Sequence, residues 1–122
     1  MASRGVDNFD NNGARDYLNM LCTQMVATIG NIAADQERLE LEEDGETLFM
    51  PSVEVLALLC ERYGAPPPQP ETVRQWRDKY LKAYDHDVDR LKASPAFKKG
   101  RRKVIEQTFG WLLGLAESHW AE

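Results

Sequence analysis

Apolar residues recur every three or four positions over much of the chain, which is the spacing that lines one face of an α-helix. The first such stretch spans about 14–34, and Asn11 or Asn12 can cap its beginning by accepting a backbone N–H group. Its apolar positions are Ala14, Tyr17, Leu18, Leu21, Cys22, Met25, Ile29, Ile32 and Ala33. The preceding residues 1–12 are rich in Gly, Asn and Asp, so we expect an ordered loop that Phe9 pins to the core.

A different pattern follows the first helix. Leu39 and Leu41 alternate with charged residues, which is typical of a strand with one buried face. Asp44-Gly45 then provides a favoured two-residue turn. The pattern therefore allows a short β-hairpin between the first and second helices.

Helical spacing returns after this segment and continues to the end of the chain. A second helix is predicted over 51–64, with a proline in its first turn and a glycine at its end. The proline-rich connection 65–70 should be stiff and extended, and a third helix should begin near residue 71 and end by 94. A fourth helix over 104–120 follows the basic cluster Lys98, Lys99, Arg101, Arg102 and Lys103.

These elements predict a mainly α-helical protein, a compact four-helix domain with the short β-hairpin as an optional addition between helices one and two. A chain of 122 residues is long enough for one hydrophobic core, so residues 1–122 are expected to form a single domain. Gly110 and Gly114 lie four positions apart in the fourth helix, which would permit close approach of another helix and leaves room for a homodimer.

The opening residues resemble a known pattern. Gly5, Phe9, Asp10, Asn11, Ala14, Asp16 and Tyr17 match the start of an uncharacterised bacterial family, domain of unknown function 4259, whose members begin Trp-Gly-x-x-x-Phe-Asp-Asn-Asp-x-Ala-x-Asp-aromatic. Arg4 stands where the family has tryptophan, and Asn12 where it has aspartate. The closing segment 116–122 is similar to the family's Ser-Glu-Leu-x-x-Leu-Trp ending. The resemblance implies a helical fold and a bacterial source, and it implies no activity.

Charge and composition narrow the functional classes. The chain carries 15 Lys and Arg residues against 20 Asp and Glu residues, a formal net charge of -5. This balance disfavours nucleic acid as a partner and favours a basic one. Cys22 and Cys60 lie within apolar helical stripes, as reduced core cysteines of a cytoplasmic protein do. No apolar run approaches the roughly 20 residues of a membrane span, so no membrane is expected as a partner.

Two groups of residues offer metal or acid–base chemistry. Asp7 and Asp10 lie in the N-terminal loop, but their spacing differs from that of a calcium-binding EF-hand, so capping and turn formation are the preferred interpretation. Asp85 and His86 lie in the third helix, where one histidine beside one carboxylate does not make a site. No nucleophile, phosphate-binding or zinc-binding motif occurs, so we predict no catalytic residue, no metal and no cofactor.

The most acidic part of the chain is the segment 35–46, which holds seven carboxylates and a single arginine. A run of like charges repels itself, and a positive surface on a partner would relieve that repulsion. A solvated turn is the other interpretation of this segment, since charged residues usually face water. The predicted partner-binding residues are Asp35, Glu37, Glu40, Glu42, Glu43, Asp44, Glu46 and Phe49, with the last as an apolar anchor.

These observations favour a non-enzymatic protein-binding module. Its most concrete form is a bacterial immunity protein or antitoxin that neutralises a cognate toxin by occluding the toxin's basic active cleft. One alternative is a small metal-dependent hydrolase that uses Asp7, Asp10, Asp85 and His86. Another is a regulatory homo-oligomer. The basic cluster is interpreted as a solvated helix entrance or as an internal partner of the acidic segment.

Overall fold

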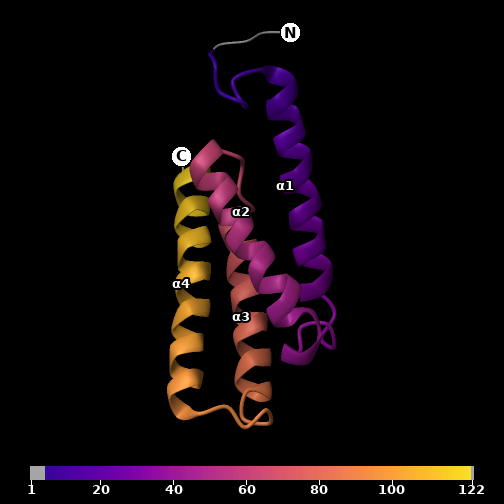
Figure 1. Ribbon diagram of the computed structural model, residues 1–122, viewed down its shortest axis with the longest axis vertical. Coiled ribbons are helices and arrows are strands. Elements are labelled where there is room, and N and C mark those ends of the chain that lie inside the picture. The colour runs from indigo at the N-terminus through magenta and orange to yellow at the C-terminus, as the bar shows by residue number, and fades with distance from the viewer. Residues whose placement is uncertain (1–4, 122) are drawn as a thin grey trace.

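The computed structural model of the protein describes residues 5–121, and four α-helices and one irregular helical segment make up its regular structure. Figure 1 shows α2, α3 and α4 packed side by side, with α1 along one flank of this group and extending beyond it at the N-terminal end. The mainly helical, compact four-helix fold is therefore confirmed. Among the described residues, no helix is both long and apolar enough to cross a membrane.

Helix α1 (Asn12–Ala33) begins where the capping residues predicted. The Asn11 side chain accepts a hydrogen bond from the backbone N–H of Ala14 at 2.8 Å, which satisfies one of the free donors at the helix start. The Phe9 ring packs against the Tyr63 ring with 4.7 Å between centroids, so the loop before α1 is fastened to α2. Residues 1–4 of the predicted ordered loop lie outside the described residues.

The predicted β-hairpin is wrong. Residues 41–49 form η1 (Leu41–Phe49), a wide helical segment interrupted at Glu43, and residues 5–121 contain no strand. Gly45 is buried rather than exposed at a turn, and a Cβ atom there would collide with the Leu39 carbonyl oxygen. Only glycine at position 45 lets the backbone there pack against the backbone of Leu39. The loop folds back on itself in this way, and both Leu39 and Phe49 are buried in the core.

The remaining helices are α2 (Met50–Tyr63), α3 (Pro70–Asp87) and α4 (Pro95–Trp120). Helix α2 ends as predicted, because Gly64 adopts the left-handed conformation at φ 71°. Helix α4 begins earlier than predicted, because Ser94 acts as its N-cap and accepts a hydrogen bond from the Phe97 N–H at 3.2 Å. The basic cluster therefore belongs to the first turns of α4 instead of preceding the helix.

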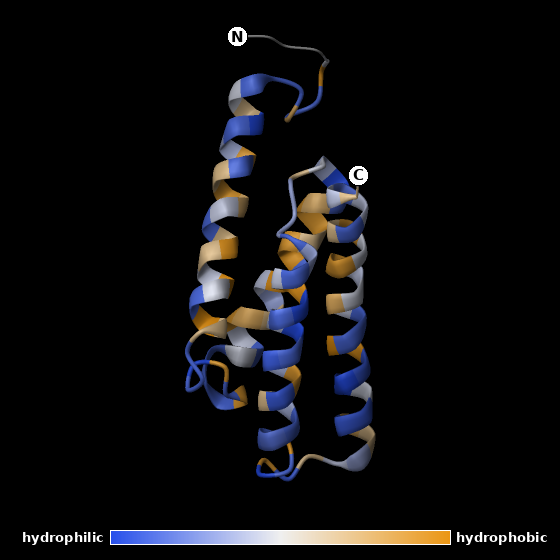
Figure 2. Cartoon of the chain, turned by 180° about the vertical axis from the view of Figure 1, so that it is seen from behind, coloured by the Kyte–Doolittle hydropathy of each residue, from blue (hydrophilic) through white to orange (hydrophobic). Residues whose placement is uncertain are grey.

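One hydrophobic core joins all of these elements. Apolar positions of each helix face the interior, while polar residues cover much of the outside (Figure 2). The fully buried large side chains of this core are Leu18, Ile29, Ile32, Phe49, Val53, Leu56, Val73, Tyr80, Tyr84, Ile105, Phe109 and Leu112. The proline-rich connection is tied to the end of α4, since Trp120 Nε1 donates to the Pro67 carbonyl at 3.0 Å.

Candidate partner-binding surface

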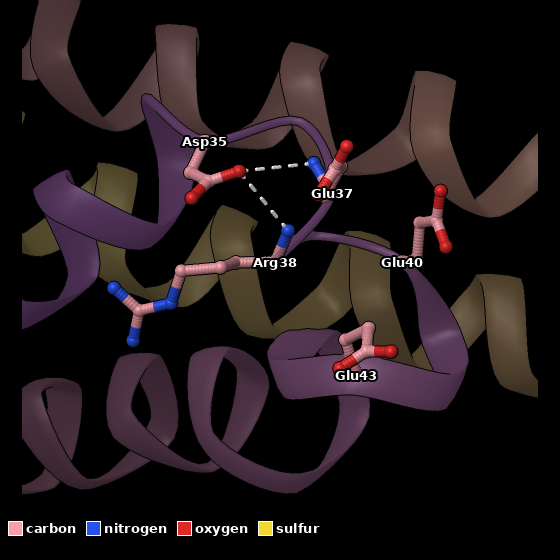
Figure 3. Close-up of a pocket in the computed structure, with 5 residues that line it drawn as sticks. All are labelled: Asp35, Glu37, Arg38, Glu40 and Glu43. Atoms are coloured by element: carbon pink, nitrogen blue, oxygen red, sulfur yellow. Dashed lines mark hydrogen bonds between the residues drawn. The ribbon is translucent and has the colours of Figure 1, made fainter.

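The acidic segment starts in the turn that follows α1. Asp35 Oδ1 accepts the backbone N–H groups of Glu37 at 3.1 Å and Arg38 at 3.4 Å, as the dashed lines of Figure 3 show. This carboxylate therefore shapes the turn and satisfies backbone donors that would otherwise face water. Its role is at least partly structural.

Two further carboxylates are paired with arginines of the same chain. Asp44 contacts Arg38 Nε at 2.8 Å, and Glu42 lies 3.6 Å from Arg90 Nη1. Both pairs are well exposed, so each is worth only about 0.2–1 kcal/mol in water. They nevertheless reduce the negative charge that Glu42 and Asp44 present to a partner.

Glu46 is drawn into a polar network between η1, α3 and α4. Arg101 donates to both of its carboxylate oxygens at 2.6 Å, and the Tyr80 hydroxyl donates to the same carboxylate. Burial alone would raise the pKa of Glu46, but the hydrogen bonds from Arg101 and Tyr80 outweigh burial and lower it. Glu46 thus fastens the acidic segment to the helices, and the basic cluster does supply an internal partner.

Other members of the basic cluster are also engaged within the chain. Arg102 pairs with Asp85 at 2.9 Å and with Glu106 at 3.0 Å, and Lys98 pairs with Asp89. The pairs with Asp85 and Asp89 link α4 to the end of α3 and to the residues that follow it. They leave Lys99 and Lys103 as the members of the cluster without an ion pair in the described part of the chain.

Besides Asp35, whose carboxylate is committed to the turn, three carboxylates of the segment have no ion pair within residues 5–121, namely Glu37, Glu40 and Glu43. They line a shallow pocket of about 420 Å³ together with Asp35 and Arg38. Figure 3 shows the Arg38 side chain extending away from Glu40, and its guanidinium pairs with Asp44. The pocket therefore has a negative rim that the described residues do not neutralise.

The prediction of Phe49 as a surface anchor is wrong. Its side chain is 0% exposed, and its ring stacks on Tyr80 with 5.1 Å between centroids. The position follows from the helical course of η1, which turns Phe49 inward and leaves Leu48 38% exposed. Of the apolar residues beside the acidic segment, Leu48 is the one placed to contact a partner.

The sequence interpretation missed Asp87. This side chain is buried, and its Oδ2 accepts the backbone N–H of Leu41 at 3.3 Å, while Oδ1 lies 3.0 Å from His86 Nδ1 and 3.7 Å from Arg90. Asp87 thereby connects the end of α3 to the start of η1. Its one sequence signal is a carboxylate three residues after the core residue Tyr84, on the apolar stripe of a helix.

The residues of the metal-dependent alternative do not converge. Asp10 Oδ2 accepts the backbone N–H of Asp7 at 2.9 Å in the N-terminal loop, whereas Asp85 and His86 lie near the opposite end of the molecule, at the end of α3 (Figure 1). Within residues 5–121, no three His, Cys, Asp or Glu side chains gather in a group that could hold a metal ion.

The cysteines are held in unreactive surroundings. Cys22 and Cys60 are both free and buried, and burial raises the pKa of each thiol, to about 12 for Cys60. Because the thiolate is the reactive form, neither position suits a nucleophile at neutral pH.

Comparison of the chain with protein-family models, curated proteins and solved structures found no match. Three residues of the opening motif have a local structural role. Asn11 caps α1, Phe9 packs on Tyr63, and Asp10 holds the loop backbone.

Proposed function

We propose that this protein is a non-enzymatic binding module that engages a basic protein partner through Glu37, Glu40 and Glu43. The observation that carries the proposal is that these carboxylates have no ion pair in the described chain, whereas Glu42 and Glu46 of the same segment do. The preferred concrete form is a cytoplasmic bacterial immunity protein or antitoxin. It would bind across the basic active cleft of a toxin and exclude the toxin's substrate.

The way the segment is held supports this proposal. Glu46 binds Arg101 and Tyr80, and Asp87 binds the backbone of Leu41, so the acidic loop is fastened to the helices at two points. A preordered loop loses little conformational freedom on binding, which leaves more of the interaction energy as affinity. Complementary charge also accelerates association and disfavours wrong partners.

The decisive experiment uses the product of the gene adjacent to that of this chain as the binding partner, with calorimetry as the readout. The variant Glu37→Gln/Glu40→Gln/Glu43→Gln removes three charges from the loop. We expect affinity to fall roughly 10- to 100-fold at low salt, since each exposed ion pair contributes about 0.2–1 kcal/mol and neighbouring charges act together. The loss should shrink as salt concentration rises.

A matched control removes the same number of charges elsewhere. Asp7, Asp16 and Glu54 are exposed and have no ion pair within the described residues, so the variant Asp7→Asn/Asp16→Asn/Glu54→Gln should bind nearly as the parent does. If both triple variants lost the same affinity for the partner, the loss would be a general effect of net charge and would count against binding through Glu37, Glu40 and Glu43. An unchanged affinity in the loop variant would overturn it.

A second candidate function is a regulatory homodimer that forms through α4. Gly110 and Gly114 are exposed, and a Cβ atom at either position would meet nothing within 4 Å, so this face of the helix has no partner within the described chain. Light scattering over a range of concentrations tests this candidate. A mass that stays at one chain's 13.9 kDa would reject it.

A further inference from the structure

The shallow pocket lined by Glu37, Glu40 and Glu43 is called the acidic pocket below. A second hollow lies directly beside it, between residues 33–40 and α3, and we call it the 33–40/α3 groove. Its volume is about 520 Å³, larger than that of the acidic pocket. The loop that follows α1 and residues 79–87 of α3 line the groove. Figure 1 shows this loop at the same end of the molecule as the C-terminal part of α3. Glu37 and Glu40 line both hollows, so the two adjoin along the acidic segment.

The solvent-accessible charged side chains of Glu and Lys on the two sides of the groove have opposite signs, while Asp87 on the α3 side is buried and accepts the Leu41 backbone N–H. Glu37 and Glu40 line the loop side, and Lys79 and Lys82 line the α3 side. Lys79 and Lys82 are three residues apart on the helix, which puts them on one face. None of the four forms an ion pair anywhere in the part of the chain that the structure describes, so the walls do not neutralise each other across the gap.

Small and apolar residues also line the groove. Ala33, Ala34 and Ala83 contribute single methyl groups, and Leu39 contributes a side chain that is 3% exposed. Three alanines at the junction of two helical elements explain why the space is hollow. They would also allow the backbone of a bound chain to approach closely.

We propose that the groove binds an extended segment of the partner protein in which cationic and anionic side chains alternate. Successive side chains of an extended chain point to opposite sides, so such a segment turns its cations to Glu37 and Glu40 and its carboxylates to Lys79 and Lys82. The inference rests on the proposed function, because it adds the sequence pattern that the acidic loop would recognise. A preference for alternating charges also distinguishes this surface from one that binds any polycation.

The groove sets the length of that segment. The face from Lys79 to His86 covers seven helical steps, or roughly 10 Å at the usual rise of an α-helix. An extended chain covers that distance in about three residues. A hexapeptide therefore spans the groove with a margin at each end.

The test compares three capped hexapeptides by titration into isotopically labelled protein, followed by NMR. The first is (Arg-Glu)₃, the second is the block peptide Arg₃Glu₃ with the same composition and net charge, and the third is hexaarginine. We expect (Arg-Glu)₃ to bind about fivefold more tightly than the block peptide, the gain of two additional exposed ion pairs. Its binding should shift the amide signals of Glu37, Glu40, Lys79 and Lys82 together.

Variants of the protein test which side chains cause the preference for (Arg-Glu)₃ over the block peptide. Lys79→Gln/Lys82→Gln should abolish the difference between the two neutral peptides, whereas Lys99→Gln/Lys103→Gln, which removes two lysines of α4 that have no ion pair in the described chain, should preserve it. Ala34→Leu adds bulk to the lining of the groove at an exposed position and should weaken binding of (Arg-Glu)₃ without weakening that of hexaarginine.

The outcomes separate the two proposals. Equal binding of (Arg-Glu)₃ and the block peptide, or a preference that persists in Lys79→Gln/Lys82→Gln, would overturn the groove proposal. Hexaarginine that still shifts Glu37, Glu40 and Glu43 would leave the proposed function standing in that case. Hexaarginine that shifts none of those three residues would count against the proposed function, whatever the order of the two neutral peptides.

Discussion

The substitution Glu46→Gln probes the network that fastens the acidic segment to the helices. Glutamine keeps the size of the side chain but removes its charge, so Arg101 would lose its bidentate partner. The side chains of Arg101 and Glu46 are 22% and 26% exposed, respectively, so the pair lies between a surface ion pair and a buried one.

This intermediate exposure sets the expected magnitude. Loss of one partner costs about 3–5 kcal/mol in a fully buried pair and about 0.2–1 kcal/mol in an exposed pair. We therefore expect Glu46→Gln to lower the free energy of unfolding by about 2 kcal/mol, between these two limits. For a chain of this length that corresponds to a fall in Tm of roughly 8 °C.

Urea denaturation followed by circular dichroism at pH 7 measures this loss. Glu106→Gln is the matched control, because Glu106 pairs with Arg102 on the exposed side of α4 and should cost less than about 0.5 kcal/mol. A double-mutant cycle of Glu46→Gln with Arg101→Gln should give a coupling energy of at least about 1 kcal/mol. Coupling near zero, or equal losses at Glu46 and Glu106, would refute the argument that this pair fixes the segment.

Three further predictions concern pH, backbone conformation and thiol reactivity. The folded-state pKa of Glu46 is lowered from 4.5, so the ionised carboxylate stabilises the fold above pH 4.5, and this stabilisation disappears as pH falls through the folded-state pKa. Unfolding curves from pH 6 to pH 3 should therefore show the parent losing more stability than Glu46→Gln. Gly64→Ala should destabilise the protein by about 1 kcal/mol in thermal melts, because φ is 71° while the nearest atom to an added Cβ is 3.9 Å away; an unchanged Tm would contradict the left-handed cap. A thiol reagent at pH 8 should label Cys60 only as the protein unfolds, since burial raises its pKa to about 12, and rapid labelling of the native protein would show that the thiol is accessible.

Local sequence signals were sufficient for most of the helical framework. The three- and four-residue spacing located the four helices, and Asn11 and Gly64 marked a beginning and an end that the structure confirms. The sequence predicts the end of the third helix at Ser94-Pro95, but the same pair is also a favourable start signal, and in the structure it begins α4. A local pattern of this kind does not specify its own direction.

The hairpin error and the missed contacts have a common physical cause. The alternation around Leu39 and Leu41 is a valid strand signal, but burial of Leu39 and Phe49 against the helices overrides it. Glu46 and Arg101 are 55 residues apart, and Leu41 and Asp87 are 46 apart, so no spacing rule connects them. The acidic segment was therefore predictable as a charge cluster, while the distinction between its paired and unpaired members required the fold.

The reliance of η1 on α4 has a consequence for synthesis of the protein on the ribosome. Arg101 is translated 55 residues after Glu46, so the nascent chain lacks this fastening until most of its length has been made. Until then Glu46 has no Arg101 guanidinium to neutralise it, and the acidic stretch repels itself as a solvated run of charge. The surface proposed to meet a partner can therefore reach its final shape only after residue 101 has been made.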